Sequence, residues 1–323
     1  MPKLFGLENK KELQMFDLDK FKTSVSTPFI LGVSGGVDSI ALLDFLAKNK
    51  KTLPEFKVVH VNHNISNQSD DWAKFVQNVC INYNIECEIH NVMIPNRGNL
   101  ENLARKARYG VFSGYPEKTI VLAHHRNDQI ETFFIKLFRG SGLRGLRGMT
   151  YESTSWANNI QKIIRPLLNV SRAEIEEYGV ANSLTWIEDP SNSNTKYDRN
   201  WIRKNLYPLI MDRFCIADIN IPRSMKFIEE NNELIQDLAI IDLQNVLMDN
   251  VINWPKLALL SHLRIKNLLI YILETNGVYS YSTNQIEQWS KSIKLTSSDS
   301  KIQLNFDNFQ IHKKGNKICL IKK

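Results

Sequence analysis

The sequence of 323 residues contains few cysteines, and their spacing fits no common metal or redox motif. Cys80, Cys87, Cys215 and Cys319 show neither C-x-x-C spacing nor a histidine at zinc-binding intervals. This spacing excludes the usual zinc and iron–sulfur motifs, and it predicts reduced thiols, most of them buried.

Long hydrophobic runs are also missing. No apolar stretch approaches the ~18 residues that a membrane-spanning helix needs, and residues 1–20 carry mixed charge without an apolar signal core. We therefore expect a cytoplasmic protein with no membrane partner. The sequence shows no internal repeat and no low-complexity tract.

The sequence does have an ordinary soluble composition with a basic balance. Hydrophobic residues make up 43% and charged residues 23%, and the length predicts two domains, each with its own core. Lysine and arginine outnumber aspartate and glutamate by 41 to 34, which gives a net charge of +7. This balance suits a polyanionic partner, although many basic proteins bind no nucleic acid.

The stretch S-G-G-V-D-S lies between an apolar run at residues 29–33 and an apolar helical stripe that begins at Ile40. It predicts a turn between a buried strand and a helix. Gly35 and Gly36 lack Cβ, so backbone N–H groups and the helix N-terminus can surround an anion there. The predicted phosphate-binding residues are Ser34, Gly35, Gly36, Val37, Asp38 and Ser39.

This loop differs from the common P-loop, because Asp38 stands where a cation would be expected. A carboxylate beside a polyanion predicts a bridging divalent cation, so the loop implies Mg²⁺ together with a nucleoside triphosphate. The alternative is a structural Gly-Ser turn. The S-G-G-x-D-S pattern resembles the signature of the PP-loop ATP pyrophosphatase superfamily, whose members cleave ATP between the α and β phosphates.

Strand and helix patterns alternate four times along the first half of the chain. Apolar runs predict strands at 29–33, 57–63, 85–89 and 119–123, and weaker ones at 160–165 and 184–187. We expect an α/β fold with a parallel sheet covered on both faces and ligands at the carboxyl ends of the strands. A composition shift predicts a catalytic domain at 1–214 and a smaller, mostly helical domain with a short β tail at 215–323.

Glu101, Arg105 and Arg108 share one face of a predicted helix, because they are spaced i, i+4 and i+7. One interpretation is a solvated ion pair worth less than ~1 kcal/mol. The other is that the planar arginines hold phosphate or developing negative charge.

Residues 124–132 follow the fourth predicted strand and have the sequence H-H-R-N-D-Q-I-E-T. Asp128 and Glu131 lie three apart at a helix start, so both carboxylates face one side, within reach of a metal shared with Asp38. The alternative is ordinary helix capping and a favourable helix dipole. His124 and His125 could act as bases or contact the nucleoside, whereas zinc would lack a third ligand.

A basic, glycine-rich segment follows this helix. One interpretation is that this segment binds RNA phosphates or a splayed base through Arg139, Arg144 and Arg147. The alternative is a helix C-cap with solvent-facing charges.

Seven motifs that follow one another along residues 28–210 together resemble the pattern of the tRNA(Ile)-lysidine synthase family. They are S-G-G-V-D-S, the H-V-N-H strand end, E-x-x-A-R-x-x-R-Y, A-H-H-x-x-D-Q-x-E-T, R-G-S-G-x-x-G-L-x-G-M, R-P-L-L, and W-I-E-D-P-S-N with R-N-x-I-R. The resemblance implies a ligase that adenylates O2 of the first anticodon cytidine of isoleucine tRNA with a CAU anticodon. The ε-amine of free lysine then attacks C2, and AMP leaves.

With this resemblance, the residues take expected roles. Asp38 and Glu131 are expected to hold Mg²⁺, Arg105 to contact the adenylate, and Asp128 to position or deprotonate lysine. Arg139, Arg144 and Arg147 are expected to bind the tRNA.

The sequence departs from the family pattern at two positions. Asn127 stands where the family usually has an acid, and Ile65-Ser66 replaces a usual Leu-Arg pair, which removes one expected phosphate contact. The chain is also shorter than the longest family members, so it is expected to make fewer contacts to the tRNA body.

Two other functions fit part of the sequence. A thiolating or amidating PP-loop enzyme would need a cysteine pair, iron–sulfur ligands or a further nucleophile domain, none of which the sequence pattern offers. A non-catalytic RNA-binding protein would keep the glycine loop as a turn only, which the presence of Asp38, Arg105, Asp128 and Glu131 disfavours.

Overall fold

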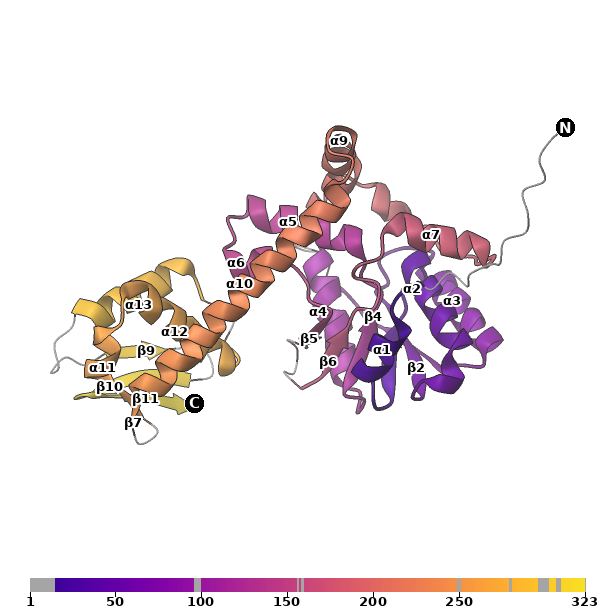
Figure 1. The fold of residues 1–323 in the computed structure, drawn as a ribbon. Helices are drawn as coiled ribbons and strands as arrows, with labels where there is room; N and C mark the ends of the chain where they lie inside the picture. The colour runs from indigo at the N-terminus through magenta and orange to yellow at the C-terminus, as the bar shows by residue number, and fades with distance from the viewer. Residues whose placement is uncertain are drawn as a thin grey trace. The chain divides into compact units, whose positions relative to one another are not determined.

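The computed structural model describes residues 15–95, 100–155, 157, 160–248, 251–278, 281–295, 302–305 and 309–322. The chain forms two compact units, Met1–Lys226 and Phe227–Lys323 (Figure 1). They divide inside one helix, α10 (Ala217–Val246), whereas the composition shift predicted a boundary after residue 214. The helix continues through Pro222, so this proline does not mark an element end.

The first unit is built on a six-stranded sheet in the order β3-β2-β1-β4-β6-β5. Neighbouring strands run parallel, except that β5 pairs antiparallel with β6. The strands are β1 (Phe29–Gly32), β2 (Phe56–Asn62), β3 (Cys87–Asn91), β4 (Thr119–Leu122), β5 (Glu152–Thr154) and β6 (Lys162–Ile164). The strand order reverses between β1 and β4, which is where open parallel sheets bind ligands.

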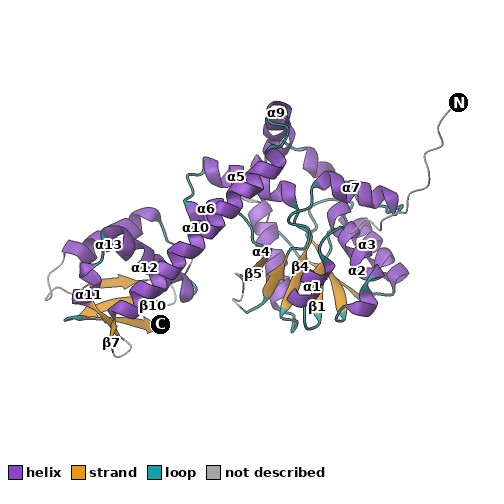
Figure 2. Cartoon of the chain, viewed as in Figure 1, coloured by secondary structure: helices purple, strands orange, loops and turns teal. Residues whose placement is uncertain are grey.

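Helices cover both faces of this sheet, as the alternating pattern predicted (Figure 2). They are α1 (Leu18–Ser24), α2 (Val37–Lys48), α3 (Ser69–Tyr83), α4 (Leu100–Ser113), α5 (Arg126–Phe138), α6 (Leu143–Leu146), α7 (Arg172–Ala181), α8 (Asp198–Trp201) and α9 (Tyr207–Arg213). Short 3₁₀ turns occupy Lys50–Thr52 and Pro190–Ser193, and a π-helical turn occupies Ile202–Leu206 between α8 and α9.

Successive residues of β1 explain why the strands are apolar throughout. Leu31 packs with α1, α2, α3 and α7 in one core cluster, whereas Ile30 packs with Tyr109 and Phe112 of α4 in another. Both strand side chains are fully buried. Each such burial stabilises the fold by roughly 1.5–3 kcal/mol. A strand buried on both faces therefore shows a continuous apolar run rather than alternation.

The second unit combines helices with an antiparallel sheet in the order β7-β8-β11-β10-β9. Its elements after α10 are β7 (Leu247–Met248), β8 (Val251–Asn253), α11 (Trp254–Leu259), α12 (His262–Thr275), α13 (Thr283–Leu295), β9 (Ile302–Asn305), β10 (Phe309–Lys314) and β11 (Lys317–Lys322). Gly315 and Asn316 form the turn between β10 and β11, and the sheet is larger than the expected short β tail.

One predicted strand is wrong. Residues 184–187 form no strand in the structure, and they run instead as an extended segment beside the glycine loop. The Ile187 N–H donates to the Gly35 carbonyl at 2.9 Å, so the backbone pairs with the loop rather than with the sheet. Within the described ranges, no helix has both the length and the apolar character needed to cross a membrane.

Candidate active site

A cavity of about 620 Å³ lies at the carboxyl ends of β1 and β2. Its lining comes from the S-G-G-V-D-S loop, from the strand end at 59–66, from Arg108 of α4 and from the segment 187–192. The structure thus brings the predicted phosphate loop and the H-V-N-H strand end together, where a parallel sheet places its ligands.

The glycine loop has the tight geometry that the sequence predicted. Gly35 adopts φ +96°, which side chains rarely tolerate, and a Cβ there would lie 2.5 Å from Cδ1 of Ile187. Ser39 Oγ lies within the loop and accepts hydrogen bonds from the N–H groups of Ser34 and Gly35, at 3.1 and 3.2 Å. Backbone donors therefore converge on one oxygen-sized position at the start of α2.

Asp38 projects from the first turn of α2 beside Arg172 and His125. Its Oδ2 accepts a hydrogen bond from Nη1 of Arg172 at 2.7 Å, and its Oδ1 lies 3.7 Å from Nε2 of His125. Burial raises the pKa of the Asp38 carboxyl, and the charges of His125 and Arg172 oppose this rise. Oδ1 is buried and accepts no hydrogen bond. An oxygen of this kind is a suitable ligand for Mg²⁺.

His125 lies between Asp38 and Asp128. Its backbone N–H donates to Asp128 Oδ2 at 3.1 Å, and its Nε2 lies 3.5 Å from the same oxygen. Asp128 therefore caps the start of α5, as one interpretation of the sequence expected. The imidazole of His125 separates it from Asp38. Burial raises the pKa of Asp128, but the neighbouring His125, His124 and Arg199 outweigh burial, and the pKa lies below its usual value.

Glu131 is buried and held by arginines from the R-N-x-I-R motif. Arg203 donates to both carboxylate oxygens, at 2.6 and 3.1 Å, and Nε of Arg199 lies 3.3 Å from Oε2. Burial raises the pKa of Glu131 despite these charges. A metal ion on Glu131 would have to replace one of these arginine contacts, so the predicted metal role of Glu131 stays a prediction.

The helix α4 places its two motif arginines differently. Arg108 lines the cavity, whereas Arg105 lies with its guanidinium carbon 5.1 Å from the ring centroid of Tyr109 and is not among the cavity-lining residues that the structure describes. Burial, together with the charge of Arg108, lowers the pKa of His63 to about 4. The predicted contact of Arg105 with an adenylate stays a prediction. The side chain of Glu101 lies outside the described residues.

The basic glycine segment is partly helical. Residues 143–146 form α6, and Gly140 at φ +68° ends α5, so the C-cap interpretation is correct for its first residues. Arg139 donates to Asp198 at 2.8 Å. Arg144 is half-buried, with both terminal guanidinium nitrogens out of contact with solvent, and Arg147 is half-buried.

Gln129 fixes the far end of this segment to α5. Its amide nitrogen donates to the Met149 carbonyl at 2.5 Å, and its Oε1 accepts the Met149 N–H at 2.7 Å. Gln129 lies next to Asp128, so the segment is attached directly beside the acidic residues.

The two family departures have structural partners. Oδ1 of Asn127 accepts the backbone N–H of Arg172 at 2.9 Å, which satisfies a donor in the first turn of α7. Oγ of Ser66 accepts the N–H of Gln68 at 3.2 Å, just before α3. The amide of Asn127 and the hydroxyl of Ser66 therefore each accept a hydrogen bond from a backbone N–H group.

Sequence reasoning missed the role of Arg172. This residue belongs to a capping-box pattern that predicts a helix start, and the pattern says nothing about a partner 134 residues away in the sequence. It connects Asp38 of α2 to Glu176 of its own helix, at 2.7 Å to each.

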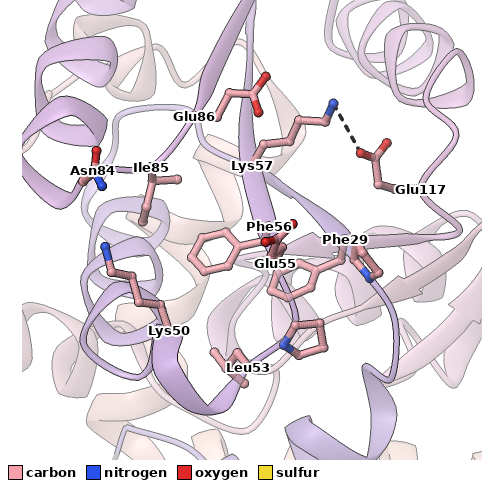
Figure 3. A pocket seen from close by; sticks show the side chains of 12 residues that line it. Phe29, Lys50, Leu53, Glu55, Phe56, Lys57, Asn84, Ile85, Glu86 and Glu117 are labelled. Atoms are coloured by element: carbon pink, nitrogen blue, oxygen red, sulfur yellow. Dashed lines mark ion pairs between the residues drawn. The ribbon is translucent and has the colours of Figure 1, made fainter.

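A smaller cavity, of about 380 Å³, lies at the amino ends of the same strands (Figure 3). Lys57 extends over it and forms ion pairs with Glu88 at 3.0 Å and Glu117 at 3.3 Å. No predicted site residue lines this cavity.

Within the described residues, no three His, Cys, Asp or Glu side chains converge as a metal site. Mg²⁺ in nucleotide enzymes commonly uses only one or two carboxylates together with substrate phosphates, so this arrangement agrees with the buried Oδ1 of Asp38 as a ligand. The described cysteines are unpaired: Cys80 is buried, Cys87 is half-buried and Cys215 is exposed, while the side chain of Cys319 lies outside the description.

Comparison with known proteins agrees with this geometry. A family model described as a PP-loop domain matches residues 9–210. The chain is 33% identical to tRNA(Ile)-lysidine synthase of Nitrosomonas europaea, over 87% of this chain and 62% of that protein. It is 34% identical to that of Actinobacillus pleuropneumoniae, over 88% and 68%, and 36% identical to that of Haemophilus influenzae, over 69% and 53%.

The fold is also similar to a solved structure of the U34-tRNA thiolase NcsA from Methanococcus maripaludis. The TM-score is 0.52 at 16% identity, over 64% of this chain and 72% of that one, which supports the α/β fold alone. The chain spans between about half and two thirds of the length of the relatives named above. The PP-loop family model matches residues 9–210, and the chain is 33–34% identical to two tRNA(Ile)-lysidine synthases over most of its length. The chain therefore belongs to the tRNA(Ile)-lysidine synthase family of PP-loop proteins.

Proposed function

We propose that this protein ligates free L-lysine to C2 of the first anticodon cytidine of isoleucine tRNA with a CAU anticodon. The reaction uses ATP, passes through a cytidine adenylated at O2, and releases AMP and pyrophosphate. One observation carries the proposal: in a chain of this family, the glycine loop and Asp38 lie beside His125 and Asp128 at a single sheet edge.

In the first step, O2 of the cytidine attacks the α-phosphorus of ATP, and the bond to the β-phosphate breaks. The N–H groups that now bond to Ser39 Oγ are aimed to bind phosphate oxygens of the nucleotide. Asp38 would hold Mg²⁺ through its buried Oδ1, and the metal would stabilise the negative charge of the departing pyrophosphate. Arg172 fixes the other carboxylate oxygen.

In the second step, the ε-amine of lysine attacks C2, and the C–O bond to AMP breaks. The ammonium group of lysine must first lose a proton. Asp128 keeps a low pKa, so its negative charge attracts the ammonium group and positions it. The proton acceptor is one of Asp128, Glu131 or His125, and the close carboxylate–imidazole contacts suit a proton transfer among them.

The tRNA would contact Arg139, Arg144 and Arg147, as the sequence predicted. Gln129 holds this segment beside the acids, so an RNA bound there lies close to the reacting cytidine. Arg139 would exchange its carboxylate partner Asp198 for a phosphate, since both are exposed.

The test is incorporation of labelled lysine into an isoleucine tRNA transcript with a CAU anticodon, in the presence of ATP and Mg²⁺. We expect one lysine per tRNA and one AMP per lysine. An elongator methionine tRNA transcript serves as the matched control, because it carries the same anticodon. If AMP forms only with a sulfur or ammonia donor, the enzyme has another PP-loop chemistry. If tRNA binds without AMP formation, the protein is an RNA-binding protein.

A further inference from the structure

The end of α5 exposes an apolar patch within the basic segment. Phe138 is 65% exposed, Leu137 43% and Leu143 42%. The three residues surround the turn between α5 and α6 in the first unit, two elements that Figure 1 labels next to each other. An exposed phenylalanine with exposed leucine neighbours is unusual unless the surface binds a partner.

The ring of Phe138 is held in place by other aromatic side chains. Phe134 stacks on it with centroids 5.9 Å apart and an interplanar angle of 26°, and Phe133 meets Phe134 edge-on at 5.6 Å. Because Phe134 supports the ring and most of Phe138 remains exposed, a further planar group can stack there at little cost in side-chain entropy.

The charges around this patch are positive. Lys136 and Arg139 are exposed on either side of the Leu137-Phe138 pair, and the half-buried Arg147 follows at the end of α6. Arg139 pairs with the exposed Asp198. An aromatic ring within a basic rim is the combination that single-stranded nucleic acids bind, with bases on the ring and phosphates on the cations.

The patch also lies at a useful distance from the acids. Asp128 and Phe138 are on the same helix, ten residues apart, which corresponds to about 15 Å along the axis. An RNA loop with its cytidine at Asp128 can therefore place a neighbouring nucleotide at Phe138.

We propose that Phe138 is a stacking platform for an unpaired base of the anticodon loop. The inference rests on the proposed function and adds a contact that no motif assigned. The arginines would supply sequence-independent attraction, and the ring would supply the contact that requires an unpaired base.

The first experiment measures binding of an anticodon stem-loop of isoleucine tRNA to Phe138→Ala, Phe138→Trp and Phe214→Ala. Phe214 is 62% exposed elsewhere in the first unit, so it is a matched control. We expect Phe138→Ala to weaken binding roughly 5- to 150-fold, the range for loss of one stacked base. Phe138→Trp should keep or improve affinity, and Phe214→Ala should leave it unchanged.

Salt dependence separates stacking from charge. For Phe138→Ala, the slope of log affinity against log salt should stay at the wild-type value while the affinity falls. For Arg147→Ala, the slope should become shallower by about 0.7, as expected for one phosphate contact of a single strand. A flattened slope for Phe138→Ala would overturn a stacking role.

A second experiment places 2-aminopurine at each position of the anticodon loop in turn. At one or more positions we expect fluorescence quenching on binding to wild-type protein that is absent with Phe138→Ala. Equal quenching with both proteins at every position would overturn the proposal, as would a change in oligomeric state of Phe138→Ala in sedimentation, since the ring would then bind another copy of the chain. Absence of lysine incorporation by the wild-type protein would instead contradict the proposed function.

Discussion

The two edges of the parallel sheet each carry a cavity with a buried carboxylate oxygen that accepts no hydrogen bond, and the glycine loop lies at the carboxyl edge. At the amino edge, Lys57 forms ion pairs with Glu88 and Glu117 within 3.3 Å, and Oε2 of Glu117 is buried without a hydrogen bond. Figure 3 shows the ion pair of Lys57 with Glu117. At the carboxyl edge, Asp38 keeps one buried oxygen without a hydrogen bond, although His125 and Arg172 lie nearby.

This difference teaches how to distinguish a structural cavity from a functional one in the same domain. A buried carboxylate oxygen without a hydrogen bond does not by itself mark a binding site, because Asp38 and Glu117 each have one. A site that binds a cation and a polyanion must keep groups whose pairing is completed by the ligand. At the carboxyl edge, Asp38 lies beside the backbone donors of the glycine loop, whereas at the amino edge Glu117 pairs with Lys57.

The largest expected effect comes from removing the charge of Asp38. We expect Asp38→Asn to reduce ATP-dependent AMP formation at least ~100-fold, because the amide cannot replace a carboxylate as a metal ligand. Thermal unfolding without nucleotide should be almost unchanged, since burial already disfavours the charged form and the amide still accepts from Arg172.

The amino edge provides the control for this variant. Glu117→Gln leaves Lys57 paired with Glu88 and should change AMP formation by less than ~2-fold. If Asp38→Asn and Glu117→Gln had the same effect on turnover, the distinction between the two edges would be wrong. Undiminished turnover of Asp38→Asn alone would remove the metal role.

A smaller effect is expected when the glycine loop is given a side chain. Gly35→Ala should lower the free energy of unfolding by about 2 kcal/mol, because its φ of +96° and the contact with Ile187 both disfavour Cβ. Gly36→Ala is the matched control, since its φ is −71° and the nearest atom to a Cβ is 3.7 Å away. Denaturant unfolding measures both.

The double variant Gly35→Ala with Ile187→Ala separates the two causes. It should recover the part due to the side-chain contact and keep the part due to the backbone angle. Equal destabilisation by Gly35→Ala and Gly36→Ala would contradict the loop conformation.

The smallest expected effect is on the pH dependence of stability. Burial and Arg108 lower the pKa of His63 from 6.5 to about 4, so the unfolded chain takes up this proton at a higher pH than the folded protein does. This contribution to stability is present above pH 6.5 and is lost as the pH falls toward about 4. His63→Gln should therefore flatten the profile of unfolding temperature in this window, by roughly a few degrees.

Arg108→Gln should flatten the same window less, because burial remains as the larger cause. Unfolding temperatures recorded across the window for wild type and both variants measure this. A wild-type profile that His63→Gln leaves unchanged would show that His63 titrates normally in the folded protein.

Much of the first unit could be predicted from its sequence, because each parallel strand is an apolar run with a helical pattern after it. The S-G-G-V-D-S loop and the A-H-H-x-x-D strand end were expected to meet, since carboxyl ends of parallel strands share one edge. The segment 184–187 misled the prediction, because Ile187 packs on the loop at Gly35 and donates its N–H to the Gly35 carbonyl, and the segment does not join the sheet. The strand β5 is three residues long and gives no periodic signal.

The partners of the acids could not be predicted in the same way. The pairs Arg172–Asp38 and Arg203–Glu131 join residues 134 and 72 positions apart. Such contacts depend on how helices pack around the sheet, which hydrophobic periodicity does not specify. No sequence pattern singled out Phe138, and only the structure distinguishes this exposed ring from the buried Ile130 on the same helix.

The hydrogen bonds within the glycine loop have a consequence for selectivity. The N–H groups of Ser34 and Gly35 already donate to the neutral hydroxyl of Ser39, so an incoming ligand must compete with an internal acceptor. Water is no better an acceptor than a serine hydroxyl and gains nothing by entering, whereas a charged phosphate oxygen forms stronger hydrogen bonds. The loop therefore binds anionic acceptors in preference to neutral ones.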